Sequence, residues 1–493
     1  MPDTTPGRAT AREAIALLTG AAGFTEHRPP PSPLPPDGPL GWAGYDAARG
    51  RASARTGEEE SVVYGTGVVG DRACVLLSFE FGFLGGSLGR QTGDRLAAAY
   101  QLALTRRIPL VALVATGGSR MQEGMVALTQ LQRVAAASVR LRAAGLPQVA
   151  VVRDPTTGGG WATVGAGADV VLALPGAQVG FAGSRVRPPD ADPYAYSAEG
   201  QFAAGQVDAV VPADELAVAV THWLRALGPH GELPAAPVPG ALSAGEGEPG
   251  AGAGTGAGAG TEARATTGSG AGTGSAAGTP SAAGRDPAAR LPETGREAVA
   301  RARDARRPRA EAYLADYFAV RLPLHGDRSG STDPGLLCGF GLRADGRPVA
   351  YVAQCGTPTR PAGYRAAART IRLADRLGVP VLTLVDTPGA ANDAEAERAG
   401  AGAAIADTFA AIAAARVPVT TLVIGEGGSG GALALAAPGN THMTVDSYFS
   451  VIAPELAAAI LKRPLSETGA TADQLRLRPQ DLVDLGFARS IIG

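Results

Sequence analysis

The chain contains the same α/β pattern twice, at a constant offset of 271 positions. In the first copy a helix-like stretch, Gly93–Thr105, leads to the apolar strand Ile108–Ala115; in the second, Gly363–Leu377 leads to Val379–Asp386. The offset also gives two pairs of prolines and two pairs of glycines: Pro109 with Pro380, Pro147 with Pro418, Gly118 with Gly389, and Gly159 with Gly430. Pro147 and Pro418 each open an apolar strand. Chance matching in a glycine-rich chain is the alternative, but the apolar strands match as well. A duplicated α/β unit is therefore predicted, with sites in the loops after the strands.

A low-complexity tract separates the two copies. From about Pro229 to Arg290 the chain consists mainly of Ala, Gly, Ser, Thr and Pro, and such a composition cannot bury enough apolar surface to offset its ordering entropy. Near the N-terminus, Pro29–Pro36 favours polyproline II over a packed core. We therefore expect a largely disordered N-terminal extension (1–60), a first domain (61–228), a flexible linker (229–292) and a second domain (293–493).

Composition excludes several classes of protein. Lys plus Arg (44) nearly balances Asp plus Glu (46), whereas a general nucleic-acid-binding protein needs a basic excess. Three scattered cysteines, Cys74, Cys338 and Cys355, fit neither a disulfide scaffold nor a four-cysteine zinc site, so no metal is expected. No apolar run reaches the roughly 18 residues of a membrane span, and the N-terminus lacks a signal peptide's apolar core. The sequence thus predicts a cytoplasmic protein with no membrane partner.

Two glycine motifs do not have the context that their usual function requires. Gly65–Gly70 fits GxGxxG, but a second apolar run, Ala73–Phe79, follows where a dinucleotide fold needs a helix, so a β-turn is the better interpretation. Gly427–Gly431 fits the GxSxG of a serine hydrolase. Only His442 follows Ser429, however, and no acidic residue lies between them, which argues against that class.

Chemistry performed by the backbone remains. Glycines at the start of a helix present N–H groups to a developing negative charge, and the missing Cβ lets a carbonyl approach the main chain. Two such loops occur at equivalent places in the repeat, Thr157–Gly160 and Gly428–Ala432. Tight packing between strand and helix is the alternative for either loop alone. Their pairing favours two oxyanion sites, as a reaction with two carbonyl-derived anions would need.

At these residues the chain resembles the carboxyltransferase component of bacterial acetyl-CoA carboxylase, with β-type and α-type subunits fused. The resemblance covers roughly residues 61–212 and 296–493. The β-type motifs are ATGGSRMQEG (Ala115–Gly124), DPTTGG (Asp154–Gly159) and PGAQVGFAGSRV (Pro175–Val186). The α-type motifs are LHGDRSG (Leu324–Gly330), VDTPGA (Val385–Ala390), VIGEGGSGGALAL (Val423–Leu435) and YFSVIAPE (Tyr448–Glu455).

The resemblance implies a fold and a reaction. It implies two crotonase-like (ClpP/crotonase superfamily) β-β-α domains, one β-type and one α-type. It also implies transfer of a carboxyl group from carboxybiotin to acetyl-CoA, giving malonyl-CoA for fatty acid biosynthesis. By this resemblance Gly158 and Gly159 hold the enolate oxygen of the thioester, and Gly430 and Gly431 hold the ureido oxygen of biotin.

The resemblance also implies further site residues. The predicted substrate-binding residues are Gly117, Gly118, Arg120, Gly160, Gly389 and Ala432. Of these, Gly117, Gly118 and Arg120 match a loop near the CoA site. A structural salt bridge is the alternative role for Arg120.

Partners follow from the same resemblance. The biotin would be attached to a separate biotin carboxyl carrier protein and carboxylated by a separate biotin carboxylase. The family precedent implies a homodimer in which halves of two protomers form each site. Its zinc ribbon is not expected here, because the first 60 residues contain no cysteine. Two other functions stay open: an acyl-CoA decarboxylase that uses the same enolate site without biotin, and a non-catalytic regulatory scaffold.

Overall fold

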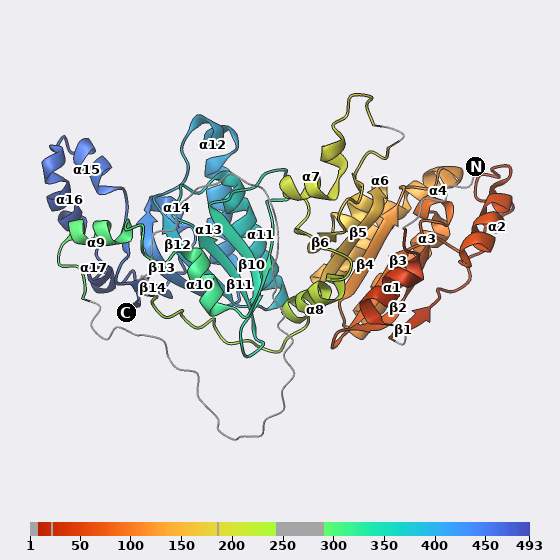
Figure 1. The fold of residues 1–493 in the computed structure, drawn as a ribbon, viewed down its shortest axis with the longest axis horizontal. Helices are drawn as coiled ribbons and strands as arrows, with labels where there is room; N and C mark the ends of the chain where they lie inside the picture. Colours follow the sequence, from red (N-terminus) through yellow and green to blue (C-terminus); the bar gives the residue numbers. More distant parts are fainter. Residues whose placement is uncertain (1–7, 21–22, 185–186, 243–289) are drawn as a thin grey trace, which may run out of the picture.

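The computed structural model describes residues 8–20, 23–184, 187–242 and 290–493. Two eight-stranded sheets lie side by side, each built by one half of the chain (Figure 1). Most of the predicted linker, 243–289, lies outside the described residues. The two-domain α/β architecture predicted from the repeat is confirmed.

The first sheet has the strand order β1-β2-β3-β4-β5-β6-β8, with β7 paired to the end of β5. The pairs β1–β2 and β2–β3 are antiparallel, and the remaining pairs are parallel. Its strands are β1 (Phe24–His27), β2 (Val62–Val69), β3 (Arg72–Phe79), β4 (Leu110–Thr116), β5 (Gln148–Thr157), β6 (Val170–Ala173), β7 (Val179–Gly180) and β8 (Ala209–Val210).

The second sheet repeats this topology with the order β9-β10-β11-β12-β13-β14-β16, and β15 pairs with the end of β13. Again two antiparallel pairs precede the parallel ones. Its strands are β9 (Val320–Pro323), β10 (Leu336–Leu342), β11 (Pro348–Gln354), β12 (Val381–Thr387), β13 (Val419–Gly428), β14 (Thr441–Thr444), β15 (Tyr448–Ser450) and β16 (Ser490–Ile492).

Helices connect the strands as crossovers. Those of the first half are α1 (Ala11–Thr19), α2 (Tyr45–Thr56), α3 (Arg90–Arg106), α4 (Gly124–Leu128), α5 (Gln130–Ala143), α6 (Gly158–Gly160), α7 (Ala198–Ala203) and α8 (Leu216–Leu227). Those of the second half are α9 (Gly295–Ala302), α10 (Ala310–Tyr317), α11 (Pro361–Leu377), α12 (Ala394–Arg398), α13 (Ala401–Ala414), α14 (Ser429–Leu433), α15 (Pro454–Ile460), α16 (Thr468–Gln474) and α17 (Pro479–Asp484). Short turns of helix occur at η1 (Leu84–Gly86), η2 (Met121–Glu123), η3 (Trp161–Gly165), η4 (Pro193–Tyr196) and η5 (Leu465–Glu467).

The repeat extends to the ends of individual elements. Helix α3, strand β4, helix α5 and strand β5 have the same bounds as α11, β12, α13 and β13 after 271 residues are added. Even the irregularity is repeated, because the β4–β5 register shifts between Val114 and Thr116 and the β12–β13 register between Val385 and Thr387. The predicted duplication is therefore confirmed at the level of single residues.

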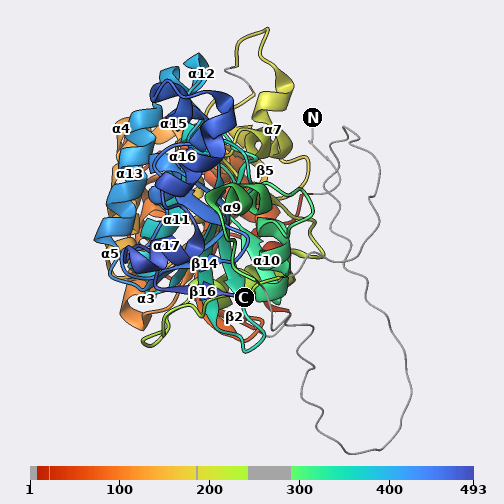
Figure 2. The same ribbon diagram turned by 90° about the vertical axis from the view of Figure 1, so that its left-hand side faces the viewer.

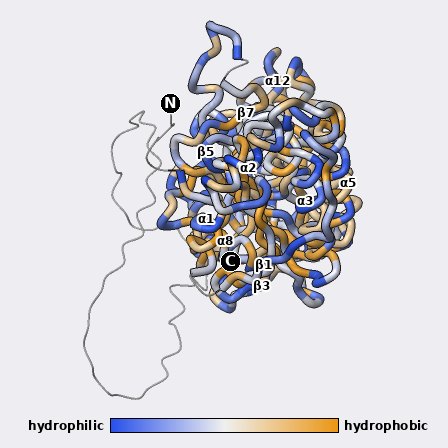
Figure 3. The backbone as a smooth tube through the Cα atoms, turned by 90° about the vertical axis from the view of Figure 1, so that its right-hand side faces the viewer, coloured by the Kyte–Doolittle hydropathy of each residue, from blue (hydrophilic) through white to orange (hydrophobic). Residues whose placement is uncertain are grey.

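Apolar strands form the interior (Figure 3). Alternate residues of β4 face opposite sides: Leu110, Ala112 and Val114 pack with α3 and α5, whereas Val111 and Leu113 pack with α1 and α8. In the second half, α13 and α10 lie on opposite sides of the sheet (Figure 2). No helix among the described residues is long and apolar enough to cross a membrane.

The two halves share one core. Trp223 of α8 meets Phe340 of β10 edge to face, with ring centroids 6.3 Å apart, and the same hydrophobic cluster continues into α11. A buried carboxylate, Asp208, accepts hydrogen bonds from Arg328 and Arg369 of the second half. The last described residues before the gap also pack on the second half, since the Ala236 carbonyl accepts a hydrogen bond from Thr420.

The structure corrects the expectation that residues 1–60 are largely disordered. Residues 11–19 form α1, whose Ala11, Ala14, Ile15 and Leu18 are buried in the shared core. Their spacing places all four on one face of the helix, and Thr10 caps it through a hydrogen bond with Glu13. Packing of this apolar face stabilises the helix, although the segment that follows it is rich in proline.

Candidate active site

Both glycine loops lie where a parallel strand passes into a helix. In the first turn (residues 157–160) β5 leads into α6, and in the second turn (residues 428–431) β13 leads into α14. Each turn lies beside the end of the neighbouring strand, because β5 pairs with β4 and β13 pairs with β12. The turns therefore occupy the carboxyl edges of their sheets, where sites of α/β proteins form.

The N–H groups of Gly159, Gly160, Gly430 and Gly431 are available as donors. No hydrogen bond outside the helices reaches them among the described residues. In the first turn of a helix an N–H group also has no acceptor within the helix. Each turn thus presents two adjacent backbone donors, which is the arrangement that stabilises an oxyanion.

Close packing surrounds the glycines of the first turn. Gly158 has a φ of +65° and Gly118 a φ of +103°, and a Cβ at Gly158 would lie 3.0 Å from the Gly118 Cα. Gly159 and Gly160 are buried, and a Cβ at Gly159 would lie 2.5 Å from Cδ1 of Leu131 on α5. The backbone of the first turn is therefore covered by a side chain.

The second turn is more open. Ser429 and Gly430 are exposed, and a Cβ at Gly430 would meet nothing within 4 Å. Gly431 is buried under Tyr364 and the Gly389–Ala390 backbone. The space on the Cβ side of Gly430 is therefore open, whereas that of Gly431 is filled.

The remaining predicted substrate-binding residues lie close to the two turns. Gly117 donates its N–H to the Gly85 carbonyl, and Gly118 packs on Gly158. Gly389, with a φ of +142°, donates to the Thr387 hydroxyl and lies beside Gly428. Ala432 follows Gly431 in α14 and is fully buried. The structure thus brings each of these residues to the turn of its own half.

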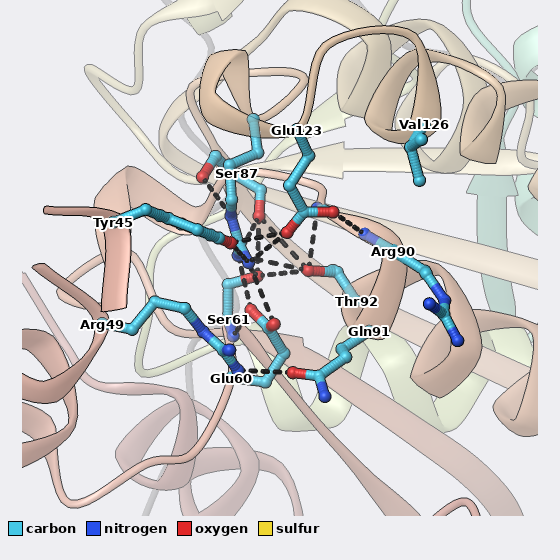
Figure 4. A network of polar contacts seen from close by, with 12 residues as sticks. Tyr45, Arg49, Glu60, Ser61, Ser87, Arg90, Gln91, Thr92, Glu123 and Val126 are labelled. Atoms are coloured by element: carbon cyan, nitrogen blue, oxygen red, sulfur yellow. Dashed lines mark hydrogen bonds and ion pairs between the residues drawn. The ribbon is translucent and has the colours of Figure 1, made fainter. Parts of the chain in front are cut away.

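Arg120 is different, because its guanidinium is fully buried in a polar network (Figure 4). Nη1 donates to Glu60 over 3.0 Å, to Tyr45 over 3.1 Å and to Glu123 over 3.3 Å. Nε and Nη2 reach Ser87, Ser61 and Thr92. With its donors engaged and no exposed surface, the side chain has a structural role, which is the alternative that the sequence left open.

The network keeps its buried carboxylate charged. Burial raises the pKa of Glu60, but the adjacent Arg120 charge and its hydrogen bonds outweigh burial, so the pKa of Glu60 lies below its usual value. Tyr45, which comes from the segment expected to be disordered, has its pKa raised by burial and stays neutral. The network therefore fixes α2 and the loop after β4 to the first sheet.

In the described part of the chain, Ser429 has no histidine partner of the kind that a serine hydrolase needs. The Ser429 hydroxyl forms no hydrogen bond with another described residue, and His442 bonds to Ser490 and Asn440. Within the described ranges no group of three His, Cys, Asp or Glu residues could hold a metal ion.

Two polar residues that contact the second turn were not predicted from the sequence. Tyr364 on α11 and Gln354 at the end of β11 both donate to the Gly431 carbonyl. Neither belongs to a motif, and the repeat offers no counterpart, because the equivalent positions are Gly93 on α3 and Phe79 at the end of β3. Only the folded structure brings them to the turn.

Comparisons with known families cover both halves. Residues 40–210 match the carboxyl transferase domain model, and residues 288–493 match the acetyl co-enzyme A carboxylase carboxyltransferase-like model. The chain is 36% identical over 486 residues to acetyl-coenzyme A carboxylase carboxyl transferase subunits beta/alpha of Saccharopolyspora erythraea, covering 95% of this chain and 75% of the relative. It is 30% identical to a probable biotin-dependent acyl-coenzyme A carboxylase beta3 subunit of Mycobacterium bovis, covering 90% and 81%.

Solved structures share the fold at low sequence identity. The transcarboxylase 12S hexamer core, solved with methylmalonyl-coenzyme A bound, is similar with a TM-score of 0.71 and 20% identity, covering 99% of this chain and 87% of that one. A single-chain, multi-domain long-chain acyl-CoA carboxylase gives a TM-score of 0.69 at 20% identity and covers 99% and 45%.

Proposed function

The chain belongs to the acetyl-CoA carboxylase carboxyltransferase family and is the carboxyltransferase component of such an enzyme, and from this premise we propose which of its groups perform the transfer. The observation that supports the proposal is the pair of free backbone donors at equivalent places in the two halves. In this proposal each turn stabilises one of the two oxyanions that the reaction requires.

The first turn handles the acyl-CoA. Removal of the α-proton of acetyl-CoA moves negative charge onto the thioester oxygen, and we assign this oxygen to the free N–H groups of Gly159 and Gly160. The predicted donor Gly158 is not used, because its N–H already donates to the Phe181 carbonyl over 3.0 Å. An oxyanion donor of this kind is typically worth about 2.7–4 kcal/mol of transition-state stabilisation. Leu131 covers this part of the backbone and limits the access of water.

The second turn handles the carboxyl donor. Carboxybiotin supplies the carboxyl group when it is bound, and we assign its ureido oxygen to the N–H groups of Gly430 and Gly431. The open space above Gly430 fits a group that arrives from outside the chain. Gly389 and Ala432 fix the shape of this turn through backbone packing.

The proposal includes two protein partners and a second copy of the chain. A biotin carboxyl carrier protein would deliver the biotin, and a biotin carboxylase would load it. Figure 1 shows α6 and α14 well apart on different sheets, so one chain alone does not bring the two turns together. In a homodimer the first turn of one copy would face the second turn of the other.

Exposed apolar side chains near both turns support this assembly. Phe181 lies at the first turn, where its carbonyl accepts a hydrogen bond from the Gly158 N–H, and Met121 and Met125 are exposed in η2 and α4, which follow Gly118. Leu433 belongs to α14 itself, and Ile460 is 70% exposed on α15. Apolar side chains exposed in groups mark protein interfaces, and a second copy would bury them.

One assay tests the function. The purified chain would be mixed with a carboxylated biotinyl carrier and acetyl-CoA, and malonyl-CoA would be measured by mass spectrometry. We expect malonyl-CoA only when the carboxylated carrier is present. Loss of CO₂ from malonyl-CoA without biotin would instead identify a decarboxylase, and a folded chain with neither activity would identify a scaffold. Size-exclusion chromatography with light scattering would report the dimer independently.

A further inference from the structure

The carbonyl of Gly431 has no main-chain partner in its own helix. Helix α14 has only five residues, and beyond it the Ala434 N–H donates to Gly430 while the Leu435 N–H donates to Ala432. The Gly431 oxygen, which lies between these two acceptors, accepts no main-chain hydrogen bond from the described residues that follow α14. A buried carbonyl without a partner would cost free energy, so a donor from elsewhere is needed.

Two side chains provide that donor. The Tyr364 hydroxyl donates to the Gly431 oxygen over 3.0 Å, and the Gln354 Nε2 donates to the same oxygen over 3.3 Å. Tyr364 is 1% exposed and Gln354 is fully buried. Burial raises the pKa of Tyr364, so the hydroxyl keeps its proton and remains a donor.

Gln354 also connects the second turn to the two neighbouring loops. Its Nε2 donates to the Thr359 hydroxyl over 3.1 Å, and the Thr359 N–H donates to the Gly389 carbonyl over 3.1 Å. The start of α11, the loop after β12 and the start of α14 are therefore joined through one amide. Moving α14 would break contacts in all three loops.

In the first turn the side-chain contact is a local one, since the Thr163 hydroxyl donates to the Gly159 carbonyl over 2.7 Å. By helix bounds and sheet register, the equivalents of Tyr364 and Gln354 are Gly93 and Phe79, which have no side-chain donor. There the backbone is covered by Leu131 instead. The two donors are thus specific to the exposed turn, whose backbone has no covering side chain at Gly430.

We propose that Tyr364 and Gln354 are positioning residues of the second turn: by holding the Gly431 carbonyl they fix the direction of the Gly430 and Gly431 N–H groups. The inference rests on the proposed function of this turn in binding the carboxyl donor. Neither side chain touches the reacting atoms. Their loss lets α14 rotate, so the donors no longer point at one place.

The test compares Tyr364→Phe with Tyr317→Phe in the full chain. Tyr317 is also buried and also loses one hydrogen bond, to the Pro237 carbonyl, but it does not contact α14. A net hydrogen bond is worth about 0.5–1.5 kcal/mol, so we expect Tyr364→Phe to lower kcat by roughly 3–10-fold and to raise the KM for the biotinyl carrier. The KM for acetyl-CoA should not change, and Tyr317→Phe should leave all three constants unchanged.

A second substitution removes the other donor. Gln354→Met keeps a similar volume, and it also removes an Oε1 atom that has no hydrogen-bond partner among the described residues. We therefore expect its melting temperature to stay close to that of the wild type. The double variant Tyr364→Phe/Gln354→Met should lose more activity than either single variant, roughly 10–100-fold.

Hydrogen exchange provides a readout that does not depend on activity. Amides of residues 429–433 should exchange faster in Tyr364→Phe and in the double variant, but not in Tyr317→Phe. Wild-type kcat and unchanged exchange in a folded Tyr364→Phe protein would overturn the positioning role, as would equal rises in both KM values. A wild-type chain without carboxyl transfer would instead contradict the proposed function. Faster exchange in Tyr364→Phe would still show that Tyr364 fixes the position of α14.

Discussion

Gly158 and Ser429 hold the same left-handed backbone at the same place in the two turns, with φ values of +65° and +57°. A residue with a Cβ pays roughly 1–2 kcal/mol for this conformation. The second turn accepts that cost because the Ser429 side chain points into open surroundings. The first turn could not, because a Cβ at Gly158 would lie 3.0 Å from the Gly118 Cα.

Replacing Gly158 with Ala should therefore lower the free energy of unfolding by more than the left-handed backbone conformation alone would cost. Gly439→Ala is the matched control, since Gly439 has a φ of +69° and a Cβ there would meet nothing within 4 Å. We expect Gly439→Ala to lose about 1–2 kcal/mol of unfolding free energy, and Gly158→Ala to lose more. Chemical denaturation measures both, and equal losses would show that the contact with Gly118 is unimportant.

Gly430→Val should separate catalysis from folding. The added side chain enters open space, so we expect the melting temperature to stay near the wild type while kcat falls roughly 10²–10³-fold. Gly402→Val is the control, because Gly402 is an exposed glycine on α13 with equally open surroundings. Gly159→Val is less informative, because its Cβ would lie 2.5 Å from Leu131 and disturb packing. Full activity in a folded Gly430→Val chain would refute the role of that turn.

Arg120→Met should destabilise the first half. It leaves Glu60 and Glu123 buried without their cation, and breaking a buried pair in this way typically costs about 3–5 kcal/mol. Arg106→Met, on an exposed arginine of α3, is the control. Thermal unfolding monitored by circular dichroism would distinguish them, and a similar small effect of both substitutions would count against the structural assignment.

The loss of thermal stability caused by Arg120→Met should become smaller as pH falls. In the wild type the pKa of Glu60 is lowered, so its contribution to stability is present above the usual pKa of about 4.5 and is lost as pH falls through the lowered value. Without Arg120, burial alone raises the pKa of Glu60, and protonation then relieves the buried charge. The difference in melting temperature between the wild type and Arg120→Met should become smaller as pH falls from 7 to 5. A constant difference would contradict this reasoning.

Asp208→Asn should weaken the contact between the halves. Burial raises the pKa of Asp208, but Arg328 and Arg369 outweigh it and lower the pKa, so the carboxylate is charged at neutral pH. The amide leaves two partly buried arginines without their counter-charge. We expect a lower melting temperature and a broader or split calorimetric transition. Asp316→Asn, on an exposed aspartate of α10, should change neither.

The repeat made much of this fold predictable. The 271-residue offset placed α11, β12 and β13 from their first-half counterparts, because local sequence patterns determine where such elements begin and end. It also located both turns. The burial of Arg120 was not predictable, since Glu60 and Tyr45 reach it across 60 and 75 positions of sequence. The hydrogen bonds from Tyr364 and Gln354 to the Gly431 carbonyl were not predictable either, because they depend on tertiary packing and not on a local pattern.

The exposure of Gly430 has a consequence for how activity should vary with enzyme concentration. A backbone N–H that faces bulk solvent already donates to water, so an anion gains little by replacing that water until the site is shielded. Among the described residues, no side chain fills the space on the Cβ side of Gly430. If a second copy provides the shield, specific activity per chain should fall on dilution below the dissociation constant of the pair.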